Sequence, residues 1–99
     1  MAKFVQIIEF ESDRIDESIA LDKEWEKATE GKRTAGHAMT CADRDNPGRY
    51  FVIVEFPSYE EAQKNNEMPE TQEFSKKQMG LSKGAPKFYN LDVVDEMGG

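Results

Sequence analysis

The sequence predicts an α+β fold in which four strands and two helical regions follow one another in the order βαββαβ. Runs rich in β-branched and aromatic residues recur at 3–10, 49–56 and 87–95. Stretches of helix-forming residues without glycine lie between them, at 15–29 and from residue 58 onward. With 99 residues, of which 37% are hydrophobic, the whole chain 1–99 is expected to form a single domain with a loose tail.

The first half of the chain supplies a helix and a hairpin after the initial strand. Residues 15–29 form the first expected helix, and Gly31 stops it. Residues 34–43 are expected to form a strand of mostly small side chains. The sequence NPGR at 46–49 places Pro and Gly at the second and third positions of a type II turn. This turn joins the small-residue strand to the strand 49–56 as a hairpin.

The second half contains an interrupted helix and the last strand. Ser58 and Glu61 match a capping box, in which Ser58 is the N-cap and Glu61 reaches back to it. Pro69 interrupts the helix that starts there, because proline lacks an N–H and clashes with the preceding turn. A second helical piece is therefore expected from 69 to about 82. Right-handed crossovers in the two βαβ halves then give a ferredoxin-like antiparallel sheet with the helices on one face.

The strands carry apolar residues on both faces, which predicts a homodimer. In the third strand, Val52 and Val54 point one way, while Phe51 and Ile53 point the other way. The helices can cover only one face, so a second copy packed face to face is expected to cover the other. The alternative is a partly exposed apolar face, which monomers of this size rarely tolerate.

Composition and charge argue against several classes of partner. The net charge is −7 and no basic stripe is present, so neither nucleic acid nor an anionic membrane surface is an expected partner. The N-terminal MAKFVQIIEF is too short and too often interrupted for a signal peptide or a membrane span. The lone Cys41 permits no internal disulfide, which favours a cytoplasmic protein.

No motif for a metal or a cofactor stands out. His37 and Cys41 are separated by about 13 Å along a strand, so they cannot share a metal ion. His, Cys and carboxylate residues nowhere show ligand spacing, and there is no glycine-rich phosphate motif. We therefore expect neither a metal nor a cofactor.

Three stretches of the chain resemble a group of uncharacterised actinobacterial-type proteins in the dimeric α/β-barrel superfamily. They are TEGKRTA (29–35), ADRDNPGRY (42–50) and VEFPSYEEAQKNNEMPETQEF (54–74). The superfamily includes antibiotic-biosynthesis-type monooxygenases, haem-degrading enzymes, stress-responsive barrel proteins and muconolactone isomerases. Its monooxygenase branch commonly carries a His before a Pro-containing turn and an aromatic residue after it. Here Pro69 and Phe74 match this pattern, and the His is absent.

The break at Pro69 predicts a ligand pocket, because it lifts the helical layer away from the sheet. The resemblance implies that a small, mainly apolar organic ligand is held in that space. Trp25 and Phe74 are the candidates for apolar contact, and Asn66 for orienting the ligand through its amide. Alternatively, Trp25 belongs to the core, and Asn66, like Asn65, satisfies free carbonyls at a helix end.

Asp22 and His37 are the candidates for proton transfer. Asp22 falls inside the apolar stripe of the first helix, where a carboxylate acquires a partner or a raised pKa. The alternatives are that Asp22 lies solvated at the rim of the stripe and that His37 is a strand-end residue without a catalytic role. His37 shares a strand face with Met39 and Cys41, and parity alone does not decide whether that face meets the helices.

Three functions remain open at this point. The first is a protein that binds a small, mainly apolar organic molecule, with or without converting it. The second is a cofactor-independent monooxygenase, in which the substrate activates oxygen and the protein supplies a base and a dry cavity. The third is a non-catalytic stress-responsive or assembly module. An enzyme on this scaffold would be oxygenase-like or isomerase-like.

Overall fold

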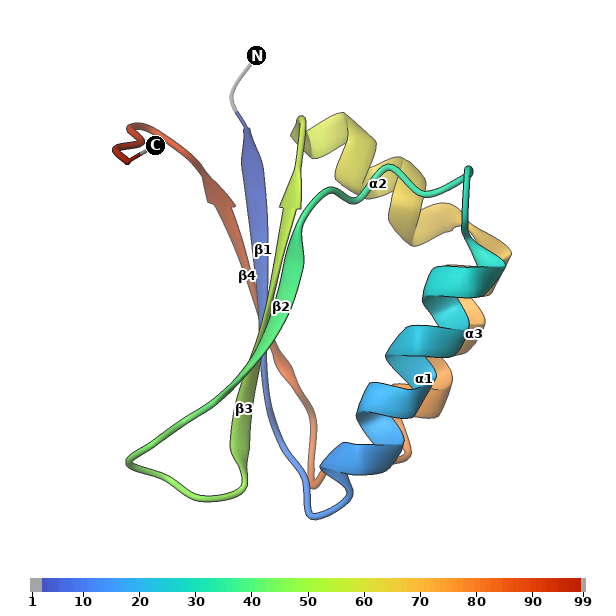
Figure 1. Ribbon diagram of the computed structural model, residues 1–99, viewed down its shortest axis with the longest axis vertical. Helices are drawn as coiled ribbons and strands as arrows, with labels where there is room; N and C mark the ends of the chain where they lie inside the picture. Colours follow the sequence, from blue (N-terminus) through green and yellow to red (C-terminus); the bar gives the residue numbers. More distant parts are fainter. Residues whose placement is uncertain (1–2, 99) are drawn as a thin grey trace.

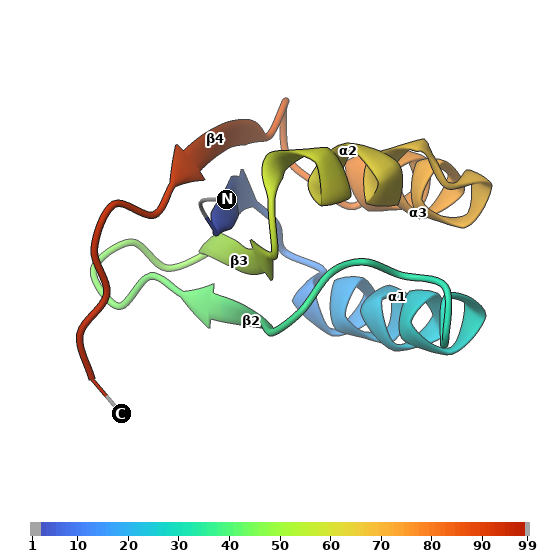
Figure 2. The same cartoon turned by 90° about the horizontal axis from the view of Figure 1, so that it is seen from above.

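The computed structural model describes residues 3–98 and shows an antiparallel four-stranded sheet with the strand order β2-β3-β1-β4 (Figure 1). The three helices form a layer on one side of this sheet only (Figure 2). This arrangement confirms the predicted ferredoxin-like α+β fold. The elements are β1 (Phe4–Glu11), α1 (Ile15–Ala28), β2 (Ala38–Ala42), β3 (Arg49–Phe56), α2 (Tyr59–Glu67), α3 (Pro69–Met79) and β4 (Lys87–Asp92).

Three elements are shorter than the sequence predicts by three residues or more. Strand β2 starts at Ala38 instead of 34, α3 ends at Met79 instead of about 82, and β4 ends at Asp92 instead of 95. Before β2, the Thr34 hydroxyl donates to the Glu61 carbonyl, which turns this segment toward α2 before it enters the sheet. The loose tail that the sequence predicts covers residues 96–99, and residue 99 lies outside the described residues.

The predicted turn and part of the predicted cap are present. The Arg49 N–H donates to the Asn46 carbonyl at 3.1 Å, and Gly48 takes a φ of +92°, as a type II turn requires. At the start of α2, the Ser58 hydroxyl accepts a hydrogen bond from the Glu61 N–H at 3.2 Å. The Glu61 carboxylate accepts from Lys64 at 3.2 Å instead of reaching back to Ser58. The N-cap prediction was therefore correct, and the reciprocal half of the capping box was wrong.

The strand register shows which side chains face the helices. Phe4 lies opposite Phe56, and the two pack with Ala62 of α2, so their face of the sheet lies under the helices. Residues opposite one another in neighbouring strands share a face, and alternate residues follow it along each strand. The helix-facing side therefore carries Phe4, Gln6, Ile8 and Phe10 of β1, Ala38, Thr40 and Ala42 of β2, Tyr50, Val52, Val54 and Phe56 of β3, and Phe88, Asn90 and Asp92 of β4.

The closely packed core is small and lies at one end of the helical layer. Within residues 3–98, the buried hydrophobic side chains are Phe4, Phe56 and Ala62. Ala35 and Val54 pack against this cluster. Helix α2 therefore anchors the helical layer to the sheet.

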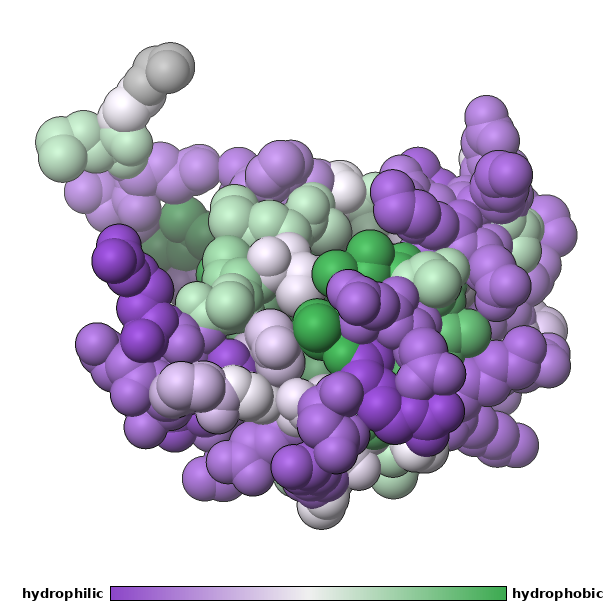
Figure 3. Space-filling model, turned by 60° about the horizontal axis from the view of Figure 1, so that its bottom comes forward, coloured by the Kyte–Doolittle hydropathy of each residue, from purple (hydrophilic) through white to green (hydrophobic). Residues whose placement is uncertain are grey.

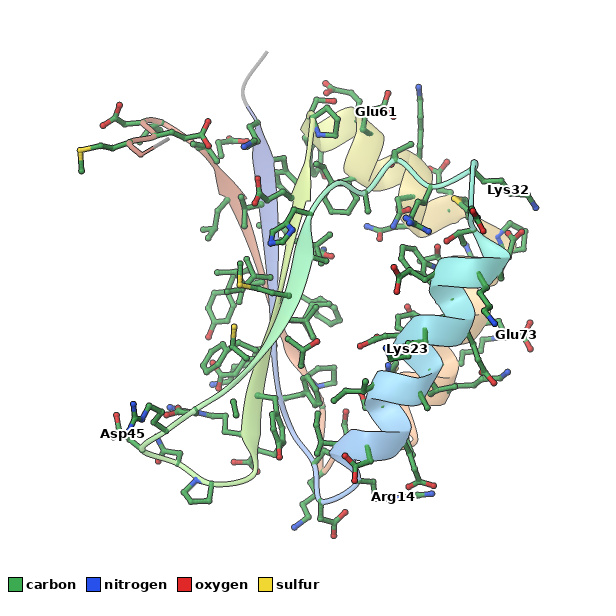
Figure 4. The ribbon with its side chains drawn as sticks, in the orientation of Figure 1. Arg14, Lys23, Lys32, Asp45, Glu61 and Glu73 are labelled. Atoms are coloured by element: carbon green, nitrogen blue, oxygen red, sulfur yellow. The ribbon has the colours of Figure 1, made fainter. Side chains whose placement is uncertain are left out.

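The rest of the helix-facing side is not closed. Ile8, Tyr50 and Val52 remain half-buried, and Thr40 is exposed. Helices α1 and α3 pack on one another. Side chains of the helical layer and of the sheet project toward each other between the two layers (Figure 4). The helix-facing side of the sheet therefore remains partly exposed to solvent beneath α1 and α3, and it carries mainly apolar and small residues there.

The opposite side of the sheet, here called the outer face, also carries exposed apolar side chains. Met39 is 44% exposed, Tyr89 41% and Leu91 44%. Figure 3 views another side of the molecule, with the bottom of Figure 1 turned forward, and shows uncharged and apolar side chains across the middle of that surface. Within residues 3–98, no helix is long and apolar enough to cross a membrane.

Candidate functional site

Helices α1 and α3 meet through polar and aromatic side chains. Ser18, Asp22 and Trp25 follow one another along α1 at spacings of four and three, which places them on one face of the helix. The Trp25 indole N–H donates to the Thr71 hydroxyl of α3 at 2.9 Å. The Trp25 and Phe74 ring centroids lie 5.7 Å apart. The structure thus brings Asp22, Trp25 and Phe74 together in the seam between α1 and α3.

Asp22 is half-buried in this seam and belongs to a small hydrogen-bond network. The Gln78 side-chain amide donates to Asp22 Oδ1 at 3.2 Å and to the Ser18 carbonyl at 3.0 Å. The Ser18 hydroxyl donates to Gln78 Oε1 at 2.6 Å. One face of Gln78 is therefore held in place by α1, and its amide points at the carboxylate.

Burial raises the pKa of Asp22 from 3.8 to about 6. The hydrogen bond from Gln78 opposes this rise, and the nearby charge of Glu26 adds to it. A carboxylate with such a pKa is largely ionised at neutral pH and is a stronger base than an ordinary aspartate. This is the range in which general bases operate efficiently. Asp22 can therefore accept a proton from a bound molecule and return it.

The aromatic pair beside Asp22 is fixed in position. Besides the bond to Thr71, the Trp25 ring carries the Arg33 guanidinium at 5.8 Å from its centroid. Arg33 in turn donates to the Glu26 carbonyl at 2.8 Å. Trp25 and Phe74 are both half-buried, so parts of their ring surfaces remain available for contact. They combine structural packing with exposed aromatic surface.

Asn65 of α2 is a buried polar residue that sequence reasoning assigned only to the helix end. Its side chain is 5% exposed, and among residues 3–98 its Oδ1 has no hydrogen-bond partner. A buried acceptor without a donor costs about 1–3 kcal/mol, so this oxygen is suited to accept a hydrogen bond from a bound molecule. The signal in the sequence was the spacing of three from the apolar Ala62, which places the two residues on one face of α2.

Asn66 lies at a different place from Asp22. It borders a hollow of about 280 Å³ between α2 and the strands β1 and β4. The other lining residues are Phe4, Gln6, Tyr59, Ala62, Gln63, Glu67 and Asn90. Neither Trp25 nor Phe74 lines this hollow, so the predicted ligand-binding residues are divided between two places.

His37 lies on the outer face and not in the helix–sheet space. It precedes β2 directly, and its carbonyl accepts a hydrogen bond from the Glu55 N–H at 2.9 Å. Strand alternation places His37 on the side opposite Ala38, with Met39 and Cys41. The small residues Ala38, Thr40 and Ala42 form the floor beneath the helices instead. The structure therefore leaves Asp22 as the proton-transfer candidate at the seam.

Searches of protein-family profiles and of curated proteins find no match to this sequence. Solved structures do share its fold. SnoaB, a cofactor-independent oxygenase from Streptomyces nogalater solved as a single-substitution mutant, superposes with a TM-score of 0.84 at 9% identity, and the match covers 100% of both chains.

Two further solved structures belong to proteins named as antibiotic biosynthesis monooxygenases. For the Caulobacter crescentus protein the TM-score is 0.81 at 11% identity, covering 95% of this chain and 92% of the other. For the Nitrosomonas europaea protein it is 0.79 at 10% identity, covering 98% of this chain and 95% of the other. The chain thus has the ferredoxin-like fold of these monooxygenase-like proteins. At such identities the likeness establishes the fold alone.

Proposed function

We propose that this protein binds a small, mainly apolar organic molecule in the space between the sheet and the α1–α3 pair. The observation that carries this proposal is the half-buried carboxylate of Asp22, with a pKa near 6, beside the aromatic pair Trp25 and Phe74. The half-exposed apolar side chains on the helix-facing side of the sheet support it. Apolar sites with a few fixed polar groups are the usual form of small-molecule sites.

The polar groups indicate a ligand with a hydroxyl group. The Asp22 carboxylate is the hydrogen-bond acceptor of this site, and a phenolic or enolic O–H is a matching donor. A carboxylate ligand is disfavoured, because it would add negative charge beside Asp22 in a protein of net charge −7. An aromatic ring that carries a hydroxyl group matches both the aromatic pair and the carboxylate.

Cofactor-independent oxygenation is the reaction that we propose for this site. Asp22 would accept the proton of the bound hydroxyl, and the resulting electron-rich anion would react with molecular oxygen. Support comes from the basic Asp22 and from the fold likeness to SnoaB, which is a cofactor-independent oxygenase. The protein would contribute the base and the position of the substrate.

Trp25 provides the test, because it is the only tryptophan and lies in the proposed site. Titration with phenols and naphthols should quench its fluorescence saturably, with weaker binding in Phe74→Ala. Asp22→Asn should retain binding while oxygen uptake, followed with an electrode, falls by at least about 100-fold. Gln72→Ala, an exposed position on α3, is the matched control and should change neither measurement.

Two results would contradict this proposal. If none of the compounds perturbs Trp25, and a crystal structure shows the space filled by side chains, ligand binding is excluded and an assembly role gains support. If Asp22→Asn takes up oxygen as fast as the wild type, the site binds without the proposed base.

We also propose that the outer face forms the interface of a homodimer. Its exposed Met39, Tyr89 and Leu91 would be covered by a second copy. Ile53 lies on this face and Val52 on the helix-facing side, so Ile53→Glu should give a folded monomer, whereas Val52→Glu should unfold the protein. A folded wild-type monomer at micromolar concentration in light scattering would contradict the interface.

The unpaired Cys41 fits the reducing cytoplasm, where we place the protein.

A further inference from the structure

A pair of carboxamides interrupts the apolar helix-facing side of the sheet. Gln6 and Asn90 lie directly opposite one another in β1 and β4, and Gln6 Nε2 donates to Asn90 Oδ1 at 3.3 Å. Along β1, the neighbours of Gln6 on the same face are Phe4 and Ile8, which are both apolar. Two amides at this place are unusual, because a strand face that meets helices normally carries apolar residues.

Helix α2 places two more carboxamides over this pair. Gln63 and Asn66 are three residues apart and therefore neighbours on the helix surface. They line the hollow of about 280 Å³ together with Gln6 and Asn90. The four amides come from three different elements, and each retains hydrogen-bonding capacity, because a carboxamide offers two donor hydrogens and an acceptor oxygen.

One wall of this hollow is aromatic. The Tyr59 ring of α2 packs edge-on against Phe4 of β1, with 5.3 Å between the centroids. Phe4 is buried, and Tyr59 is 49% exposed, so part of the tyrosine ring is available to a ligand. Glu67 is the charged residue of the lining. The hollow therefore combines a ring surface with neutral hydrogen-bonding groups and a negative charge.

We propose that this hollow is a second binding site, for a small neutral ring that carries an amide or imide group. A carboxamide presents a donor and an acceptor side by side, and it pairs with a matching donor–acceptor edge through two hydrogen bonds, as Asn and Gln do with adenine. The volume lies below the range of about 300–1,000 Å³ that is typical of drug-sized ligands, which favours a single ring. Glu67 and the net charge of −7 disfavour an anion.

This site does not depend on the function proposed above, because the two share no residue. The hollow lies on the β4 side of α2, and Trp25, Phe74 and Asp22 belong to the seam between α1 and α3. A failure of either proposal therefore leaves the other to be judged separately.

The test uses the full chain, labelled with ¹⁵N, and uracil as the probe. Uracil is a neutral ring with two N–H groups, one of which belongs to an imide, and 1,3-dimethyluracil has the same ring without these donors. Uracil should shift the side-chain amide signals of Gln63, Asn66 and Asn90 saturably. The dimethyl compound should bind about tenfold more weakly, because the acceptors of the hollow lose their donors.

Two variants complete the experiment. Asn66→Ala should weaken uracil binding about fivefold or more, while Gln72→Ala, which removes an exposed carboxamide outside the hollow, should leave it unchanged. Both positions are exposed, so circular dichroism should show intact folding for each. The proposal is overturned if the side-chain amides do not respond to uracil, if both uracils bind equally, or if uracil shifts the Trp25 indole signal instead.

Discussion

The two ends of the helical layer are held in different ways. At one end, α2 packs directly on the sheet through Ala62, which is buried against Phe4 and Phe56. At the other end, α1 and α3 are joined to each other by hydrogen bonds from Trp25 and Gln78, while the sheet beneath them stays half-exposed. Burial of apolar surface supplies stability at the first end. The second end leaves the sheet partly exposed to solvent. It also holds the only carboxylate among residues 3–98 whose pKa is strongly raised.

The largest expected effect comes from the anchored end. Phe56→Ala should lower the free energy of unfolding by about 3–5 kcal/mol, because it removes a buried ring and leaves a cavity under α2. Phe88→Ala is the matched control, since Phe88 lies on the same side of the sheet but is 57% exposed. Urea denaturation measures both variants. Equal losses in the two variants would contradict the difference between the two ends.

A smaller effect is expected where α1 meets α3. Thr71→Val removes the acceptor of the Trp25 indole N–H at a site that is 7% exposed. An unsatisfied buried donor should lower the stability by about 1–3 kcal/mol, and the indole environment should change in near-ultraviolet circular dichroism. Thr40→Val, at an exposed position of β2, is the control for the same change in side chain. A Thr71→Val protein as stable as wild type would show that the seam is not held by this bond.

The smallest effect concerns pH and Asp22. Because the pKa of Asp22 is raised to about 6, the folded protein binds more protons than the unfolded chain between about pH 4 and pH 6. The contribution of Asp22 to the stability of the folded protein is therefore present below about pH 4 and is lost as the pH rises through about 6. Partial solvent access reduces the effect to on the order of 1 kcal/mol.

Asp22→Asn should remove this loss, so that the variant is more stable than wild type at pH 7 and equal to it near pH 4. Glu24→Gln, which changes an exposed carboxylate on the same helix, is the control and should leave the pH profile of stability unchanged. Thermal denaturation at a series of pH values gives both profiles. A wild-type profile that matches Asp22→Asn would mean that the open end does not perturb this carboxylate.

Most of the fold could be predicted because its signals are local. Pro69 marks the break between α2 and α3, and the NPGR turn fixes the hairpin, since both depend on backbone chemistry within a few residues. The ends of β2, α3 and β4 were predicted less well. They depend on contacts with distant segments, such as the bond from Thr34 to the carbonyl of Glu61.

Only part of the candidate site could be read from the sequence. Trp25 and Phe74, which were both candidates for apolar contact, meet because α1 and α3 pack on one another. Asn65 and Asn66 differ by about 100° around α2, and which of them points inward depends on how α2 sits on the sheet. Likewise, the face that His37 occupies is set by the pairing of β2 with β3, which no local pattern contains.

The joint between α2 and α3 also determines how the helical layer can move. A single residue, Met68, separates the two helices and has an extended backbone, with φ −63° and ψ 134°. Pro69 donates no backbone hydrogen bond, so the ladder of α2 does not continue into α3. Each helix can therefore open to hydrogen exchange on its own. A rigid-body swing of the α1–α3 pair away from the sheet would bend the backbone at this joint and where α1 and α3 connect to β1, β2 and β4. Helix α2 would stay seated on Phe4 and Phe56.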